Sequence, residues 1–403
     1  APLGGNDAAA EACTPFLLPP SVNVDSTQWA NRFPGAPTWT CDTAGTTTID
    51  SGAGTASSTS CALAMVDLTN GVTQTAPLGP PVMVVRLRGL SLSNGHVLRI
   101  VGDKPVVFLV AGPVTVDSGA TIDASAVGTK PGPGGEAPGA SSPWCQGSSG
   151  TPGIFTTAAQ GSAAGGGGGL GTAGGQGGGG VFSPSGGSGG APSAGTNLQP
   201  LRGGCSGGGG GSAPAGAAGA SGGAGGGAFE ISASGGITIG TGSNAATLAA
   251  AGGGSPAPDK TGGMNVNGYF VNASGGGGSG GGILLVGPTT SRPSFGSAGI
   301  ARVHGGGAAG SYVSMTSSDP PATAGADGHL ADDAKAAGGH GSGSGIGGPY
   351  YENGAAGGLY SARSTTGVVV GGSAGAGNYG STGGGGGGGR VVVTTANAVS
   401  ACE

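Results

Sequence analysis

The sequence is poor in the side chains from which most globular cores and active sites are built. Of its 403 residues, 4% are aromatic and 8% are charged, and the formal net charge is −5. So few large side chains argue against a conventional globular core. Nucleic acids and anionic membrane surfaces require clustered Lys and Arg. The charge balance therefore excludes both as expected partners.

Long hydrophobic runs are also missing. The sequence has no run of about 18 apolar residues, the minimum for a transmembrane helix, so we expect no membrane-spanning segment. The first residues, APLGGNDAAAEACTPF, lack the charged and apolar regions of a signal peptide. We therefore interpret the chain as the mature form of an exported protein.

The cysteines form no Cys-x-x-Cys pair, which disfavours zinc and favours three disulfides made in an oxidising compartment. Spacing makes Cys41 with Cys61 and Cys145 with Cys205 the economical pairs, although other pairings stay open. The six residues are Cys13, Cys41, Cys61, Cys145, Cys205 and Cys402.

Glycine is abundant, at 102 residues, whereas proline contributes only 27. The absence of a strict Gly-X-Y period excludes collagen. Gly/Ser-rich tracts are flexible by default, but disordered chains usually combine high charge with few aliphatic residues. Here the charge is low and the tracts keep running into aliphatic segments. We therefore expect a folded chain.

An internal repeat occupies residues 82–126, where the sequence matches itself after a shift of about 24 residues. Apolar residues fall on apolar ones, polar on polar, and one turn falls on another. The matching positions are Leu90 and Val114, Leu92 and Val116, Leu98 and Ile122, Arg99 and Asp123, and Asn94-Gly95 and Ser118-Gly119.

Each copy alternates apolar and polar residues, which is the period of a strand with one buried face. A repeat of short strands cannot bury its own apolar row, so consecutive copies must stack. The sequence therefore predicts an all-β fold with coils of a parallel β-solenoid, in which Leu92, Leu98, Val116 and Ile122 are buried. An antiparallel meander is the alternative, because Asn-Gly is also a strong hairpin signal.

Three regions are expected along the chain. Residues 1–45 are an irregular, Pro-rich segment with Phe16, Trp29, Phe33 and Trp39, which we expect to pack on the chain's own solenoid or on a neighbouring subunit. Residues 46–127 form the coils. In residues 128–403, Gly-rich excursions alternate with returning solenoid strands. These strands are expected at 228–251, 283–304 and 390–399.

The excursions are too long for ordinary connections and need packing of their own. Glycine tracts can pack as left-handed extended helices with about three residues per turn, whose backbones pair laterally because no Cβ intervenes. Such polyglycine II helices must offset the large entropy that glycine loses on ordering. Mobile loops are the alternative.

The segment HVLRIVGDKPVVFLVAGPVTVDSGATIDASA and the junctions GGGGSGGGILLV and GGGGGGGRVVV resemble exported bacterial glycine-rich surface proteins. The Gly tracts are also similar to those of mycobacterial PE-PGRS proteins and of tip adhesins from T-even-type phages, where Gly-rich helices stack. The PE helical hairpin is absent, and the tracts are less regular than in the phage proteins. The resemblance implies surface exposure on a β-helix or Gly-helix scaffold, and it transfers no functional residue.

Catalytic motifs fail on inspection. Gly-x-Ser-x-Gly occurs at five serines, but none follows a strand and precedes a helix as a nucleophile elbow requires. The His304-Gly-Gly-Gly run lacks an α/β context, and Lys260-Thr261 lacks the cradle glycine of a phosphate loop. The five serines are Ser188, Ser206, Ser221, Ser279 and Ser373.

Two groups of charged residues are candidates for a metal-binding or catalytic site. Asp327, His329, Asp332 and Asp333 have side chains that can hold a divalent cation, but a solvated loop is the favoured interpretation because the calcium repeat of other β-solenoids is missing. Arg99 and Asp123 occupy equivalent outward positions, as in polysaccharide lyases, and a single ion pair explains them. We therefore assign no catalytic, cofactor-binding or metal-binding residue and expect no cofactor.

The expected function is an extracellular structural subunit of a bacterial surface fibre or coat, assembled head to tail. The C-terminal RVVVTTANAV offers an uncovered strand edge, and the N-terminal segment is expected to dock on the next subunit. The alternative is a cell-surface or phage-tip adhesin that binds a receptor or a glycan. Tyrosines late in the chain favour that alternative, namely Tyr350, Tyr351, Tyr360 and Tyr379.

Overall fold

The chain is all-β, as expected. The computed structural model describes residues 16–21, 35–61, 67–74, 79–154, 163–179, 185–193, 197–211, 219–259, 264–266, 269–314, 321–328, 334–340, 353–358, 361–362, 369–370 and 383–399. One 3-10 helix, Pro143–Cys145, is the only helix in these ranges, and no helix there is long and apolar enough to cross a membrane.

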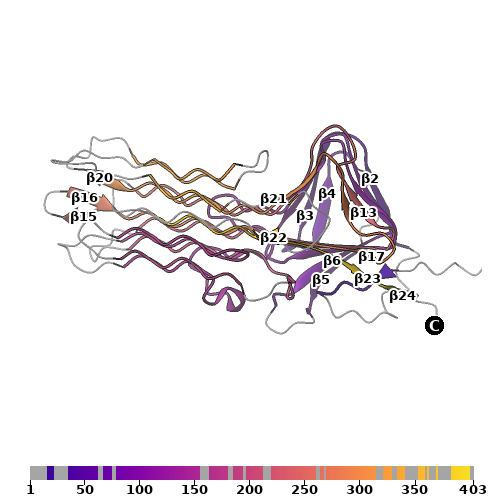
Figure 1. Ribbon diagram of the computed structural model, residues 1–403, viewed down its shortest axis with the longest axis horizontal. Coiled ribbons are helices and arrows are strands. Elements are labelled where there is room, and N and C mark those ends of the chain that lie inside the picture. Colours follow the sequence, from indigo (N-terminus) through magenta and orange to yellow (C-terminus); the bar gives the residue numbers. More distant parts are fainter. Residues whose placement is uncertain are drawn as a thin grey trace, which may run out of the picture.

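Three sheets form the body of the molecule (Figure 1). Sheet I contains β2 (Thr38–Cys41), β7 (Gly89–Leu92), β10 (Val114–Val116), β13 (Ile237–Ile239) and β18 (Ser294–Phe295). Sheet II contains β3 (Gly45–Asp50), β4 (Thr55–Ser58), β8 (His96–Val101), β11 (Thr121–Asp123), β14 (Ala246–Ala249), β19 (Gly299–Arg302) and β21 (Ser361–Ala362). Sheet III contains β5 (Asp67–Val72), β6 (Val82–Leu87), β9 (Val106–Val110), β12 (Ala228–Ala233), β17 (Gly282–Pro288), β22 (Val369–Val370) and β23 (Arg390–Ala396).

Two smaller sheets complete the fold. The chain ends pair with each other as an antiparallel sheet of β1 (Phe16–Leu17) and β24 (Ala398–Val399). A three-stranded antiparallel sheet contains β15 (Met264–Val266), β16 (Tyr269–Asn272) and β20 (Tyr312–Ser314). In Figure 1 these three strands lie at the far end of the molecule from sheets I to III.

Strand pairing follows the repeat seen in the sequence. Leu90 on β7 pairs in parallel with Val114 on β10, and Leu98 on β8 pairs in parallel with Ile122 on β11. The chain visits sheets III, I and II in turn, so each copy of the repeat lies beside the next. The register predicted from the 24-residue shift is therefore confirmed.

The inward-facing residues of the three sheets form one core. Leu92, Leu98, Val116 and Ile122 are fully buried in it, which confirms the expectation for these four positions. The turn between sheets I and II has Asn94 and Gly95 at positive φ. The equivalent turn one repeat later has Ser118 and Gly119 at positive φ. Asn and Gly adopt this conformation at low cost.

The outer strands of sheets II and III are antiparallel, so these sheets are mixed. β4 and β5 border them on the N-terminal side, and β21 and β22 border them on the C-terminal side. The expectation that RVVVTTANAV offers an uncovered edge is therefore wrong for its two ends, because β22 pairs with Arg390 and Val391 and β1 pairs with Ala398 and Val399. Short antiparallel strands protect a sheet edge from pairing with another chain.

The described part of the N-terminal segment packs on its own chain. Trp39 lies on β2 in the core, and Phe16 and Leu17 are fully buried over the outer face of sheet III. Of the two packing partners expected for residues 1–45, the chain itself is the one observed for this part, and the expectation that the segment lacks strands is wrong there. The alternation in Thr38–Cys41 is a strand pattern, but the surrounding prolines mask it.

The outer face of sheet III is apolar and covered. Val84, Val107, Leu109, Leu284 and Val286 belong to a second hydrophobic cluster, which includes Phe16 and Leu17 from the N-terminal segment. Sheet III thus buries both of its faces. This explains why its strands read as continuous aliphatic runs rather than as alternating patterns.

All three Gly-rich excursions leave the body after a strand of sheet II and return to a strand of sheet III. The first connects β11 to β12, the second connects β14 to β17, and the third connects β19 to β23. Figure 1 shows them as long extended segments that run side by side away from the three sheets. They leave from one corner of the body because the sheet II strands that precede them, β11, β14 and β19, lie side by side.

Candidate functional site

The glycine tracts are joined by a regular network of backbone hydrogen bonds. The return leg of the second excursion, residues 276–281, donates in three directions, and the direction repeats every third residue. Residues 276 and 279 donate to Gly208 and Cys205, residues 277 and 280 to Gly384 and Gly387, and residues 278 and 281 to Gly253 and Ala250. The second excursion therefore holds the first and the third together.

The network has no room for side chains at its crossing points. A Cβ on Gly278 would lie 2.0 Å from the carbonyl oxygen of Ala224, and one on Gly277 would lie 2.1 Å from that of Gly306. Both separations are far below van der Waals contact. Glycine is required here by the close approach of neighbouring backbones rather than by turn geometry.

One carboxylate fastens the tracts near the body. Asp327 Oδ1, on the third excursion, accepts hydrogen bonds from Gly128 N at 2.8 Å and Gly254 N at 2.7 Å. These two donors lie on the first and second excursions. The structure thus gives Asp327 a role in joining three segments, whereas the other candidate cation ligands, His329, Asp332 and Asp333, lie outside the described residues.

A second carboxylate lies beside the disulfide Cys145–Cys205. Glu136 is buried and accepts hydrogen bonds from Ser206 N at 3.0 Å, Ser206 Oγ at 2.9 Å and Ser142 N at 3.1 Å. Its oxygens lie close to both sulfur atoms. The sulfurs are bonded to each other, and the carboxylate already accepts several hydrogen bonds. Within the first excursion, the group therefore fastens the tract around Ser206 to the loop around residue 145.

The other described disulfide joins Cys41 to Cys61, next to a buried histidine. His96 Nδ1 lies 3.1 Å from the carbonyl oxygen of Thr43, and Nε2 lies 2.9 Å from Thr47 Oγ1. Both disulfides are the pairs that spacing favoured. Cys13 and Cys402 lie outside the described residues.

Two serines of the Gly-x-Ser-x-Gly matches, Ser206 and Ser279, take part in the hydrogen-bond network. Ser279 Oγ accepts a hydrogen bond from Cys205 N at 2.8 Å, and Ser206 Oγ donates to Glu136. Ser373 lies outside the described residues. The backbone oxygen of His304 accepts from Gly252 N at 2.8 Å, so that residue also belongs to the network.

Arg99 and Asp123 form an ion pair between adjacent coils, as their register implies. Arg99 Nη2 also donates to the carbonyl oxygen of Ser125 at 2.7 Å. The side chains are 24% and 10% exposed, so the pair is partly screened from water. It links β8 to β11 in adjacent copies of the repeat.

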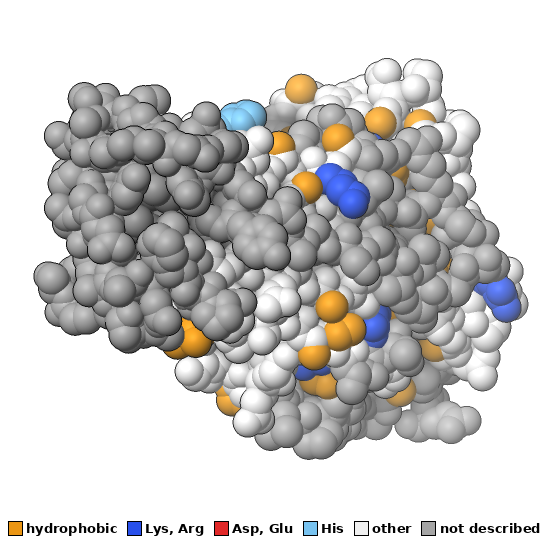
Figure 2. Space-filling model, turned by 60° about the vertical axis from the view of Figure 1, so that its left-hand side comes forward, with side chains coloured by type: hydrophobic (Ala, Val, Ile, Leu, Met, Phe, Trp, Pro, Cys, Tyr) orange, Lys and Arg blue, Asp and Glu red, His pale blue; other side chains and the backbone are white. Residues whose placement is uncertain are grey.

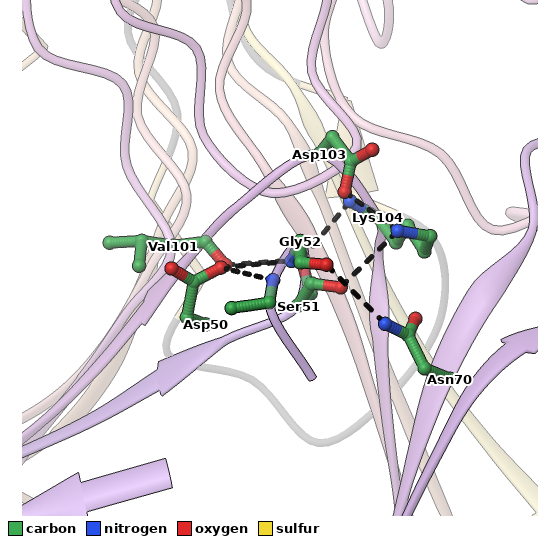
Figure 3. Close-up of polar contacts among 8 residues, drawn as sticks. Asp50, Ser51, Gly52, Asn70, Val101, Asp103 and Lys104 are labelled. Atoms are coloured by element: carbon green, nitrogen blue, oxygen red, sulfur yellow. Dashed lines mark hydrogen bonds and ion pairs between the residues drawn. The ribbon is translucent and has the colours of Figure 1, made fainter. Parts of the chain in front are cut away.

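Figure 3 shows a second charged cluster, where the turn after β3 meets the corner between β8 and β9. Lys104 Nζ donates to Asp103 Oδ1 at 2.9 Å, and Asp50 Oδ1 accepts from Gly52 N at 2.9 Å. Asp103 is 73% exposed, which limits its ion pair to about 1 kcal/mol or less. The cluster closes the turn after β3 against the corner between β8 and β9.

Charge is sparse elsewhere as well. On the face drawn in Figure 2, most described atoms belong to the backbone or to uncharged polar residues, with scattered hydrophobic and basic side chains. Such a surface offers hydrogen-bonding groups rather than an electrostatic field. It gives a charged ligand little to recognise.

Sequence inspection missed one buried acid, Glu230 on β12. It is fully buried, and it accepts hydrogen bonds from Ser21 Oγ and, at 2.8 Å, from Ser232 Oγ. Burial raises the pKa of this carboxyl to about 7, although the serine hydrogen bonds oppose the rise. A single acid inside the aliphatic run AFEISA was the signal that could have found it.

The sheet at the far end of the excursions is built from two of them. β15 and β16 belong to the second excursion, and β20 belongs to the third. Val271 on β16 pairs with both Met264 and Val313, and Asn272 pairs with Tyr312. Antiparallel pairing thus ties the two excursions together at the end that lies farthest from the core.

Comparisons with known proteins add no family. No protein-family model matches the sequence, no curated protein matches it, and no solved structure matches it.

Proposed function

We propose that the chain is an exported scaffold in which a parallel β-solenoid carries a slab of polyglycine II helices. The solenoid interpretation is supported by the parallel stacking of repeats such as Leu90 on Val114 and by the order in which the chain visits its three sheets. The period of three in the hydrogen bonds of residues 276–281 supports the polyglycine II interpretation. Two described disulfides suit an oxidising, extracellular location.

The function that this geometry supports best is adhesion, with the slab displaying the tips of the three excursions. One observation carries the proposal: all three excursions leave at the same corner and are hydrogen-bonded to one another along their length. A rigid slab preorganises its tips, and preorganisation reduces the entropy lost on binding. The expected ligand class is a surface receptor or a glycan, and no catalytic activity is proposed.

The far end also carries aromatic residues in an otherwise aromatic-poor chain. Tyr269, Phe270 and Tyr312 lie on the three-stranded sheet there. Aromatic residues are enriched at the centres of binding interfaces because they bury a large area at low entropic cost. The late tyrosines Tyr350, Tyr351, Tyr360 and Tyr379 lie outside the described residues.

A fibre or coat subunit is the second candidate, and one observation favours it. Sheet I ends in β2 on one side and in β18 on the other, and no antiparallel strand borders either end in the described ranges. Unbordered strands can pair with another copy, which gives a head-to-tail contact. Self-association through sheet I is therefore kept as the alternative.

Fluorescently labelled protein applied to a panel of whole bacterial cells separates the two candidates. We expect the wild type to bind some of the cells, and a Tyr269→Ala/Tyr312→Ala variant to lose at least tenfold in affinity with an unchanged melting temperature. Thr115→Ala on sheet I is the matched control and should bind like wild type. Equal binding by both variants would contradict display at the far end, and filaments in electron micrographs would favour the fibre.

A further inference from the structure

A short segment near the N-terminus holds the two ends of the chain together over sheet III. In residues 16–21, Phe16 and Leu17 pair antiparallel with Val399 and Ala398, and Ser21 reaches β12. Phe16, Leu17 and Ser21 are all fully buried. We call residues 16–21 the strap.

The strap covers Glu230, a fully buried acid on β12 to which Ser21 is hydrogen-bonded. Ser21 donates to the Glu230 carboxyl through its hydroxyl and its backbone N–H. The remaining donor is Ser232 Oγ, at 2.8 Å. All of these donors are uncharged, so none of them compensates a full negative charge in a site without water.

The register partners of Glu230 are apolar. Its partners in the neighbouring strands are Val107 on β9 and Leu284 on β17, and the strap above contributes Phe16, Leu17 and Ser21. The basic groups near this face are Arg86 on β6, Arg390 on β23 and Arg202 in the adjoining loop. Arg86 is aligned with Ser232 across β9, and Arg390 is aligned with Ala228 across β17. The pKa of Glu230 reflects burial and the hydrogen bonds from Ser21 and Ser232.

Space for movement exists beside the strap. A cavity of about 230 Å³ is lined by Pro20 of the strap, by Leu284 and Val286 of β17, and by Val392 of β23. Leu284 is the register partner of Glu230, so the cavity adjoins the strand pair that holds the acid. When the strap lifts, water would enter through this cavity and reach the outer face of sheet III.

We propose that the strap is a pH-sensitive closure, which stays shut while Glu230 is protonated and opens when Glu230 loses its proton. Opening separates β1 from β24 and exposes the part of the apolar outer face of sheet III that lies under the strap, including Val107, Leu109 and Leu284. The ionised carboxylate then gains the water that the closed strap excludes. This device is independent of any ligand at the far end of the excursions.

The size of the effect follows from proton linkage. The pKa of Glu230 is about 7 in the closed protein, against an ordinary value of 4.5 that applies once the strap is open. The equilibrium constant for opening should therefore rise about 30-fold between about pH 5.5 and pH 8.5. A neutral residue of the same shape at position 230 should abolish this rise.

Hydrogen–deuterium exchange of the full chain tests the proposal, with protection at each pH expressed relative to the unfolded peptide. In the wild type, peptides covering 16–21 should lose about 30-fold in protection from about pH 5.5 to pH 8.5, while peptides covering β8 to β11 stay unchanged. Glu230→Gln should keep the strap protected at both pH values. Constant protection in the wild type, or an equal loss in Glu230→Gln, would overturn the proposal.

A covalent lock gives a second test if Glu230→Gln fails to fold. Leu17 and Ala398 are register partners, so a Leu17→Cys/Ala398→Cys pair lies close enough for a disulfide. The oxidised double variant should keep its strap protected at the higher pH. Loss of protection in the locked protein equal to that of the wild type would show that the exchange does not report opening of the strap, and would contradict the proposal.

Discussion

Leu98 and Ile122 are register partners on adjacent parallel strands, and both are fully buried in the core shared by the three sheets. Each coil therefore places one aliphatic side chain directly on the next. A core built in this way is only a few side chains wide, so a polar group placed in it has no route to water.

Leu98→Asp is expected to destabilise the protein by more than about 4 kcal/mol, because it places an unpaired charge between coils. Thermal unfolding followed by circular dichroism would measure the effect. The control is Val97→Asp, one residue earlier, where the side chain is partly exposed and faces outward. If Leu98→Asp melted like the wild type, the assignment of the inward row would be wrong.

Gly278→Ala is expected to disrupt the slab, since its Cβ would lie 2.0 Å from the Ala224 carbonyl oxygen. Overpacking of this kind costs about 1–3 kcal/mol or more, because two backbones must move apart. Gly35→Ala is the matched control, as Gly35 is exposed and a Cβ there meets no atom within 4 Å. Chemical denaturation of both variants would measure the difference, and equal midpoints would contradict a close-packed slab.

Removal of the Cys145–Cys205 disulfide should loosen the first excursion more than the solenoid. The bond closes a loop with a sequence separation of 60, and a disulfide of this kind stabilises by about 2–4 kcal/mol. In Cys145→Ala/Cys205→Ala, hydrogen exchange should accelerate in residues 163–179 and 201–211 while β8 to β11 stay protected. Uniform acceleration across the chain would instead indicate that the slab and the solenoid unfold as one unit.

Asp327→Ala should weaken the junction where the three excursions meet. It leaves Gly128 N and Gly254 N without the charged acceptor that now lies 2.8 and 2.7 Å away. We expect a loss of about 1–3 kcal/mol. Asp103→Ala, at a largely exposed ion pair, should change stability by less than about 1 kcal/mol. Denaturant titration of both variants would show whether their effects differ in this order.

Stability should fall as the pH rises from about 4.5 to about 7 because of Glu230. Between pH 4.5 and about 7 the folded protein holds one proton more than the unfolded chain, since burial raises the pKa of this carboxyl. The contribution is complete below pH 4.5 and is lost as the pH passes about 7, for a total of about 3 kcal/mol. Denaturation of Glu230→Gln should lack this slope, and an identical pH profile in both proteins would contradict the assignment.

Much of the three-sheet body could be predicted from local sequence. Alternation around Leu90 and Leu98 identified the strands. The shift between the two copies identified their register, because stacked repeats place residues of the same kind beside each other. The returning strands after the Gly tracts were recognised for the same reason. Spacing also indicated the disulfide pairs Cys41–Cys61 and Cys145–Cys205.

Other features depend on contacts between residues that are distant in the sequence. Ser21 and Glu230 meet across 209 positions, and β1 pairs with β24 at the opposite end of the chain, so no local pattern marks either contact. Asp327 looked like a cation ligand in a polar loop, yet the backbones of two other excursions supply its partners.

The sequence alone determined which residues form strands and which pairs of coils can stack, because period and spacing are local properties of the chain. Only the tertiary structure decided what the glycines do. A glycine tract carries no side-chain pattern, so its hydrogen-bond partners are set by whichever backbones the stacked coils bring to the same corner. The strap over Glu230 was decided in the same way, by the pairing of β1 with β24, which meet only after folding.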